Sequence, residues 1–240
     1  MKSKKIKVAT TMLVAVVMIA FMSIATAVNA SPPNPPPDCP QTPFLPMNPA
    51  TGQASSPGMI AQMITPDGCV IEFEFWYRFA CGIWYDIYLG TSKIIGGPAH
   101  CKLDNAMFNN IRTYIVGLWA AGILPDVPPF PVIPNCDEPP FWSEMVWRFF
   151  NSSCAITVEY RMADGTRREA RISCGSGSAY CVTTYRYCWR EDKLHADQDG
   201  PIIFGKPIGC PDKEIGFIAP FGATPPIIRV NCRDAIPVCN

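Results

Sequence analysis

An alternation of apolar and polar residues is the clearest pattern in the first half of the chain. Every second residue from 71 to 79 is apolar, the pattern breaks at Cys81-Gly82, and it resumes from 83 to 89. This period places one face of a strand in a core and leaves the other face polar. We therefore predict two antiparallel strands joined as a hairpin. The more polar face of that hairpin carries Trp76, Arg78 and Trp84.

A helix is predicted from about Leu103 to Ala121. Its apolar residues recur at three- and four-residue steps, which places them on one face: Met107, Ile111, Tyr114, Ile115, Leu118 and Trp119. Asp104 or Asn105 can cap its start, and Gly122 can end it. We expect the apolar face to be a core contact rather than a cofactor or partner surface.

A second hairpin is predicted from residue 154 to 174. Ala163-Asp164-Gly165 suits a three-residue loop, because glycine readily adopts the left-handed backbone that such a loop requires. The loop pairs Met162 with Thr166, and counting outward brings the two terminal cysteines opposite each other. Together with the first hairpin and the helix, it predicts a β-rich α+β fold. In this fold, disulfides staple antiparallel hairpins or a meander around one amphipathic helix.

Two local disulfides follow from these patterns. The register of the second hairpin predicts a bridge between Cys154 and Cys174, with Cys174–Cys181 as the competing pair. Cys232 and Cys239 flank a segment with a proline that can turn back, so we predict that they close a local loop. Twelve cysteines allow too many pairings for a complete framework to be predicted.

Residues 1–30 are predicted to be an export signal. Lys2, Lys4, Lys5 and Lys7 precede an apolar run, and small residues before Ser31 offer a cleavage site near Ala30. All twelve cysteines follow this segment, so an even number reaches a compartment where disulfides persist. We expect a secreted, periplasmic or cell-surface protein with about six disulfides.

Proline divides the remaining chain. Residues 31–66 hold eleven of the 26 prolines and are predicted to be a proline-rich spacer. A disulfide-rich domain is predicted from 67 to 240. A second proline cluster separates residues 67–124 from residues 141–240, and recurring Cys and Tyr-Arg pairs suggest two similar halves related by duplication.

Charge and residue spacing limit the chemistry. Four of the twenty Lys and Arg lie in the signal, so the mature form has sixteen basic and twenty acidic residues. This excess of negative charge disfavours nucleic-acid binding and a membrane-surface role for the mature form. No Cys-x-x-Cys pair or zinc-type spacing occurs, and neither His100 nor His195 lies in a recognisable motif. We expect no metal and no cofactor.

Two function classes remain. The first is a noncatalytic binding or structural module that presents Trp76, Arg78 and Trp84 to a glycan or protein ligand. The alternative is an exported, glycan-directed hydrolase, because the carboxylates of Glu72, Glu74 and Asp86 fall on one face of the first hairpin. Ion pairing with Arg78 explains these carboxylates at least as well. We therefore expect the noncatalytic module.

Overall fold

The computed structural model describes residues 44–46, 54, 57–82, 84–124, 133–139, 146–152, 154–174, 180–204, 210, 212–234 and 236–237. The predicted signal and its cleavage site near Ala30 lie outside these residues, and so does Cys239.

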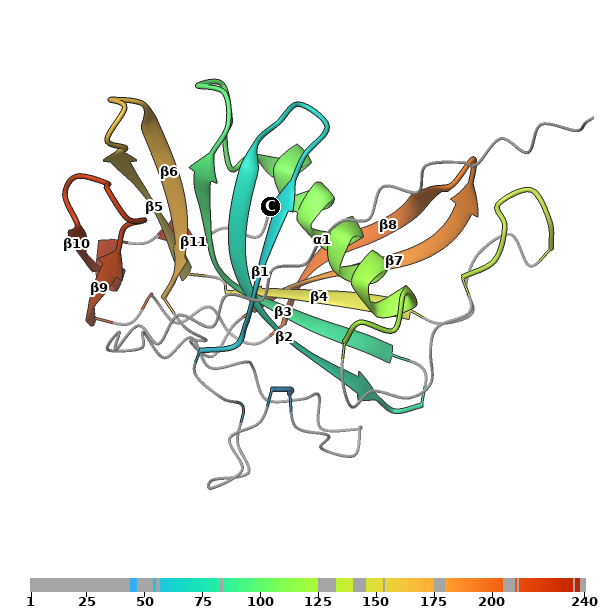
Figure 1. The fold of residues 1–240 in the computed structure, drawn as a ribbon. Helices are drawn as coiled ribbons and strands as arrows, with labels where there is room; N and C mark the ends of the chain where they lie inside the picture. The colour runs from blue at the N-terminus through green and yellow to red at the C-terminus, as the bar shows by residue number, and fades with distance from the viewer. Residues whose placement is uncertain are drawn as a thin grey trace, which may run out of the picture.

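The fold is β-rich α+β, as predicted, with one helix in the part that the structure describes (Figure 1). A nine-stranded sheet contains β1 (Met59–Ile64), β2 (Val70–Ala80), β3 (Trp84–Gly96), β4 (Val146–Ser152), β5 (Cys154–Arg161), β6 (Arg167–Ser173), β7 (Tyr180–Arg190), β8 (Lys193–Phe204) and β11 (Ile236–Pro237). A separate two-stranded sheet contains β9 (Glu214–Ile218) and β10 (Ile227–Asn231), followed by the short 3-10 helix η1 (Cys232–Asp234). The helix is α1 (Asn105–Ala120).

The β2–β3 hairpin is confirmed, and β3 is the strand around which the sheet is organised. β3 pairs with β2 along most of its length, with β4 through residues 84–89, and with β6 through Ser92 and Lys93. The β3–β4 pair is parallel, which departs from the antiparallel meander expected from the sequence. Parallel neighbours need a crossover connection, and the segment that contains α1 forms it.

Helix α1 begins and ends where the sequence indicates. The side chain of Asp104 accepts a hydrogen bond from the N–H of Met107 (2.9 Å), and Gly122 follows the helix with φ 68°. The helix packs on the apolar face of β2, β3, β4 and β7 (Figure 1). Trp119 makes edge contacts with Tyr85 and Trp147, at ring-centroid distances of 4.7 and 5.3 Å. This aromatic group is the centre of the main core.

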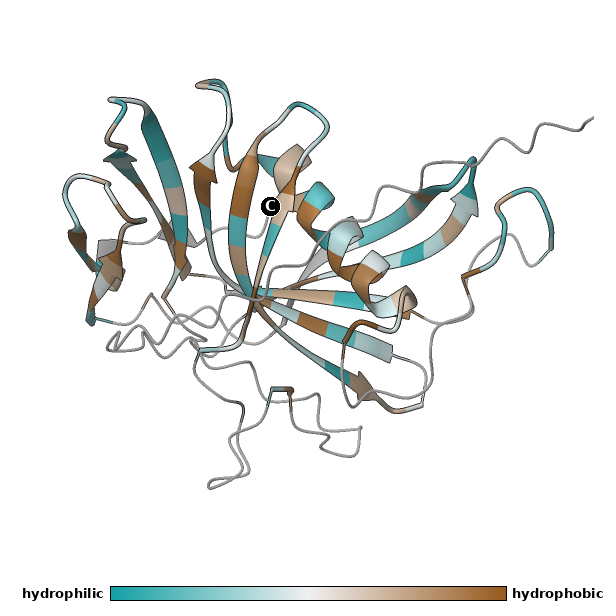
Figure 2. Ribbon diagram, in the orientation of Figure 1, coloured by the Kyte–Doolittle hydropathy of each residue, from teal (hydrophilic) through white to brown (hydrophobic). Residues whose placement is uncertain are grey.

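A second, smaller core lies between the β5–β6 hairpin and the β9–β10 hairpin. Val158 and Ile172 face Ile215 and Phe217 there, and all four are buried. Figure 2 shows apolar and polar bands alternating along these strands, whereas β8 is mostly hydrophilic. The two cores are built from different strands but share the sheet.

The second hairpin has the predicted register, but its predicted disulfide is wrong. Val158 pairs with Ala170, and the N–H of Cys174 donates to the carbonyl of Cys154 (2.9 Å). Cys154 nevertheless bonds to Cys210, and Cys174 bonds to Cys232. The β9–β10 hairpin packs on the β5–β6 hairpin, and the cysteines that flank it, Cys210 and Cys232, reach Cys154 and Cys174. The two bridges therefore join the open ends of the two hairpins.

The same pairing overturns the local Cys232–Cys239 bridge and the competing Cys174–Cys181 bridge. The other described pairs are Cys69–Cys101 and Cys136–Cys188, and Cys81 and Cys181 are also disulfide-bonded. No cysteine among the described residues is free.

Part of the predicted spacer belongs to the fold. β1 pairs antiparallel with β2 from Met59 to Ile64. Further upstream, Leu45 exchanges two backbone hydrogen bonds with Tyr77 (2.7 and 3.0 Å), and the neighbouring Phe44 is buried. Strands β2 and β3 share one sheet with β4–β8 and β11, so this sheet draws strands from both residues 67–124 and residues 141–240, and their origin by duplication stays a prediction.

Candidate functional site

The prediction of an exposed aromatic patch on the first hairpin is wrong. Trp76 and Arg78 are each only 1% exposed, and Trp84 is half-buried. A second apolar layer covers this face of the sheet: Trp76 pairs in register with Tyr88, Tyr88 with Phe150 and Phe150 with Val182. Phe44 packs on the same row. Alternation along one strand cannot show that both faces of that strand are covered.

Asp86 and Arg78 belong to a buried ion cluster that also includes Arg148. The three residues pair in register across β2, β3 and β4. Arg78 Nε donates to Asp86 Oδ2 at 2.8 Å, and Arg148 Nε donates to Asp86 Oδ1 at 2.6 Å. The guanidinium of Arg148 lies 3.7 Å from the ring centroid of Trp84. With both carboxylate oxygens occupied by arginine donors, Asp86 serves as the shared counter-charge of this row.

Glu72 and Glu74 have separate surroundings. Glu72 pairs with Lys93 (2.6 Å) and accepts from Gln62 (2.8 Å). Glu74 lies at a bulge between β2 and β3 and accepts the N–H of Gly58 at 2.8 Å. A Cβ at Gly90 would lie 2.8 Å from Glu74 Oε2, so glycine provides the room for this carboxylate. These contacts give both glutamates a structural role, and their proposed role in hydrolysis stays a prediction.

Glu74 should make stability depend on pH. Burial raises the pKa of its carboxyl above the usual 4.5, against the opposing effect of the Gly58 and Thr91 backbone N–H groups. A raised folded-state pKa stabilises the protein below the unfolded-state pKa, and this stabilisation is lost as pH rises through the folded-state value. Glu74→Gln should remove that fall in unfolding free energy, measured by urea titration from about pH 4 to about pH 8.

The matched variant Glu72→Gln retains Glu74, so it should keep the fall with pH. If wild type and Glu74→Gln lose stability in parallel as pH rises, the assignment to Glu74 is wrong.

The candidate functional site lies instead between α1 and strands β6, β7 and β8, and we call it the arginine site. It consists of Asn109, Arg112, Arg171, Tyr185 and Gln198. Arg112 Nη1 donates to Asn109 Oδ1 (2.8 Å) and to the hydroxyl of Tyr185 (2.9 Å). That hydroxyl lies 3.2 Å from both Asn109 Oδ1 and Gln198 Oε1. The helix, β7 and β8 are thereby connected through one phenol.

The local sequence explains how these side chains meet. Arg112 follows Phe108 by one helical turn, so both point to the same side of α1. Arg171 alternates with the buried Ala170 and Ile172 on β6 and therefore faces α1, where its guanidinium lies 5.0 Å from the ring centroid of Phe108. The guanidinium of Arg112 lies 5.6 Å from the ring centroid of Tyr185.

The site carries two positive charges close together in a largely buried place. Arg112 is buried, and its Nε has no hydrogen-bond partner among the described residues. Burial lowers the pKa of Arg171, and the nearby charge of Arg112 lowers it further. No described carboxylate lies within ion-pair distance of either arginine. This differs from the Arg78–Asp86–Arg148 cluster, where a carboxylate is present.

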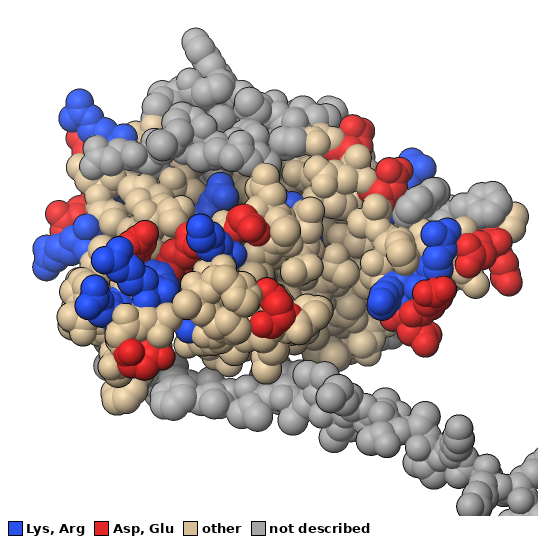
Figure 3. Space-filling model, turned by 90° about the horizontal axis from the view of Figure 1, so that it is seen from above, with Lys and Arg blue, Asp and Glu red and all other residues tan. Residues whose placement is uncertain are grey.

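Sequence patterns did not identify this site. Arg112 is not among the apolar residues that define the face of the predicted helix, and Arg171 is one of several arginines on β6. Their proximity depends on the crossover that sets α1 above β6 and β7. On the face shown in Figure 3, exposed Lys and Arg are interspersed with Asp and Glu at both ends of the molecule.

Comparisons with known proteins give no further assignment. The chain matches no protein-family model, no curated protein and no solved structure at a significant level. Within the described residues, no helix combines the length and apolar character needed to cross a membrane.

Proposed function

We propose that this protein is an exported, noncatalytic module that binds an anionic glycan at the arginine site. The observation that carries the proposal is the pair Arg112 and Arg171, which share a largely buried place without a carboxylate among the described residues. Burying a charge is costly unless it is paired. A carboxylate or sulfate group on a ligand would supply the missing charge and accept charge-assisted hydrogen bonds.

The neighbouring groups support a sugar as the carrier of that charge. The amides of Asn109 and Gln198 are exposed beside the arginines, and amides both donate to and accept from sugar hydroxyls. The ring of Phe108 lies against Arg171. A uronic acid or a sulfated sugar combines an anionic group with hydroxyls, and this combination fits charged and neutral donors set side by side.

The disulfides support an exported protein. The described residues contain four bridges and two further disulfide-bonded cysteines. Disulfides in this number are typical of a chain that folds in an oxidising compartment. They also agree with the export signal predicted at residues 1–30, although that segment lies outside the described residues.

Titration calorimetry with acidic and neutral oligosaccharides of equal length tests this function. Uronate or sulfated oligosaccharides should bind, and their neutral counterparts should not. Loss of a hydrogen bond to a charged group costs about 1.5–3 kcal/mol, so Arg171→Gln should weaken binding by about 10- to 100-fold. Added salt should weaken binding as well.

Arg186→Gln is the matched control. Arg186 is exposed on β7, next to Tyr185 but on the opposite side of the strand, and its loss should leave binding unchanged. Equal binding of neutral and acidic sugars, or equal losses in the Arg171 and Arg186 variants, would rule out the proposed site.

A further inference from the structure

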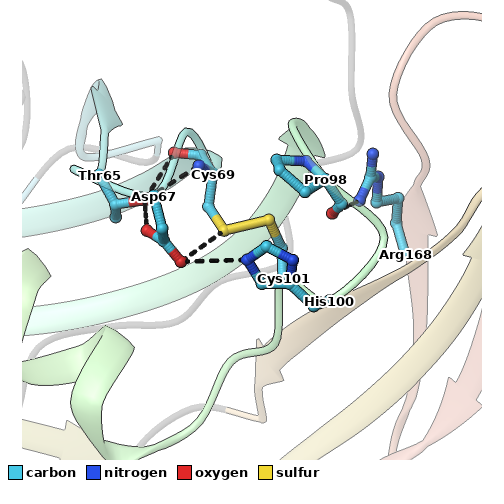
Figure 4. A network of polar contacts seen from close by, with 7 residues as sticks. All are labelled: Thr65, Asp67, Cys69, Pro98, His100, Cys101 and Arg168. Carbon is cyan, nitrogen blue, oxygen red and sulfur yellow. Dashed lines mark hydrogen bonds and ion pairs between the residues drawn. A yellow bond between two sulfur atoms is a disulfide. The ribbon is translucent and has the colours of Figure 1, made fainter.

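A second cluster of chemically active groups surrounds the Cys69–Cys101 disulfide. The turn between β1 and β2 carries Asp67 and Cys69, and the loop between β3 and α1 carries His100 and Cys101. Figure 4 shows Asp67 and His100 facing each other directly beside the disulfide. This cluster is separate from the arginine site, and the inference below does not depend on the proposed function.

Two distances in this cluster match those between the ligands of a tetrahedral metal ion. Asp67 Oδ2 lies 3.4 Å from His100 Nε2 and 3.5 Å from Cys69 Sγ. The sulfurs of Cys69 and Cys101 and a ring nitrogen of His100 all lie within 4.8 Å of one another. A tetrahedral zinc ion with bonds of about 2.0–2.3 Å holds its ligands about 3.3–3.8 Å apart. The Asp67 oxygen already has that spacing from the His100 nitrogen and from the Cys69 sulfur, whereas the two sulfurs, bonded at 2.09 Å, would have to separate.

The ligand atoms are also held from behind. The hydroxyl of Thr65 donates to the other oxygen of Asp67 and accepts the N–H of Cys69 at 2.9 Å. On the opposite side, Arg168, drawn beside Pro98 in Figure 4, donates to the carbonyls of Pro98 and Gly97 and so anchors the loop that carries His100. Such outer contacts orient metal ligands in known sites.

The bond between the two sulfurs is what keeps this cluster from being a metal site, because zinc binds thiolates rather than disulfides. We propose that the Cys69–Cys101 disulfide and a zinc site formed by Asp67, Cys69, His100 and Cys101 are two alternative states of the same four residues. The disulfide is the oxidised state, and the zinc site is the reduced state.

The interconversion balances with a dithiol as the reductant. Two electrons and two protons pass from the dithiol, which becomes a disulfide, to the Cys69–Cys101 bond, which becomes two thiols. Zinc then displaces one proton from each thiol and binds both thiolates, a neutral His100 nitrogen and the Asp67 carboxylate. Removing zinc and restoring an oxidant reforms the disulfide.

Residue spacing did not predict this site, because its residues come from two distant segments of the chain, whereas zinc motifs are recognised by cysteines that are close together in sequence. A zinc site here departs from the expectation of no metal that was drawn from the sequence. The inference concerns the form in which this one bridge is open.

The test uses the whole secreted protein, treated with a dithiol under native conditions in the presence of zinc. After desalting, the reduced protein should retain one zinc per chain, and the oxidised protein should retain none. Cobalt in place of zinc should give the thiolate-to-cobalt charge-transfer absorption of a site with two sulfur ligands. Alkylation followed by peptide mapping should show Cys69 and Cys101 protected by zinc, with the other described disulfides intact.

Single variants identify the ligands without removing the disulfide. His100→Ala and Asp67→Ala should each lower zinc affinity by at least the ~10- to 100-fold that follows loss of an outer contact. His195→Ala is the matched control: His195 pairs in register with Cys188, beside another disulfide, but belongs to no such cluster among the described residues.

Several results would overturn the proposal. These are equal zinc retention in the oxidised and reduced proteins, equal affinity in the His100 and His195 variants, and failure of the Cys69–Cys101 bridge to open before the protein unfolds.

Discussion

Asp86→Asn is expected to lower the free energy of unfolding by about 3–5 kcal/mol, the usual cost of removing one partner of a buried ion pair. Asp86 is fully buried, and its carboxylate accepts hydrogen bonds from both Arg78 and Arg148. The neutral amide would remove the negative charge that the two buried guanidinium groups share. Because the three residues span β2, β3 and β4, the loss should appear as global destabilisation.

Urea unfolding followed by tryptophan fluorescence measures this effect, since Trp84 contacts Arg148 directly. Glu214→Gln is the control. It removes a carboxylate that pairs with Arg229 on the surface, and exposed pairs contribute little to stability. An Asp86→Asn protein as stable as the Glu214 variant would show that the row of charges is not a structural requirement.

Removal of the Cys174–Cys232 disulfide by paired alanine substitutions is expected to destabilise the protein by about 4 kcal/mol on the chain-entropy relation. The bridge closes a separation of 58 residues. It also joins the end of the β5–β6 hairpin to the end of the β9–β10 hairpin, where the second core is small. The region around that core should therefore unfold at lower denaturant concentration than the rest.

Amide hydrogen exchange distinguishes this local loss from a global one. Exchange should accelerate in β9 and β10, while the amides beneath α1 stay protected. The paired alanine variant of Cys69 and Cys101, whose separation is 32 residues, is the comparison: its entropic cost is similar, but it lies beside the main core. Uniform acceleration in both variants would contradict the idea of two cores with different dependence on disulfides.

Features governed by neighbours in sequence were predictable. The ends of α1 follow from Asp104 and Gly122, and the register of the β5–β6 hairpin follows from a three-residue loop. The positions of Cys154 and Cys174 followed from the same local geometry. Their partners did not, because the β9–β10 hairpin that supplies Cys210 and Cys232 packs on them from a distant part of the chain.

Features that depend on a second layer were not predictable from one strand. Trp76 and Arg78 fall on the more polar face of β2, but Phe150 and Val182 from later strands bury that face. The arginine site could not be predicted from the sequence for a related reason. Arg112 lies on the polar side of an amphipathic pattern and becomes buried only when β6 and β7 are in place. Both the burial of Trp76 and Arg78 and the burial of Arg112 depend on the crossover from β3 to β4.

The position of β3 between strands from both halves of the chain has a practical consequence for protein production. A fragment ending near residue 124 would present the bare edge of β3 to solvent and lack Trp147, Phe149 and Tyr185, which complete the core under the helix. An open strand edge beside uncovered aromatic residues invites intermolecular pairing. Truncation at the central proline cluster would thus yield aggregating pieces rather than two soluble domains.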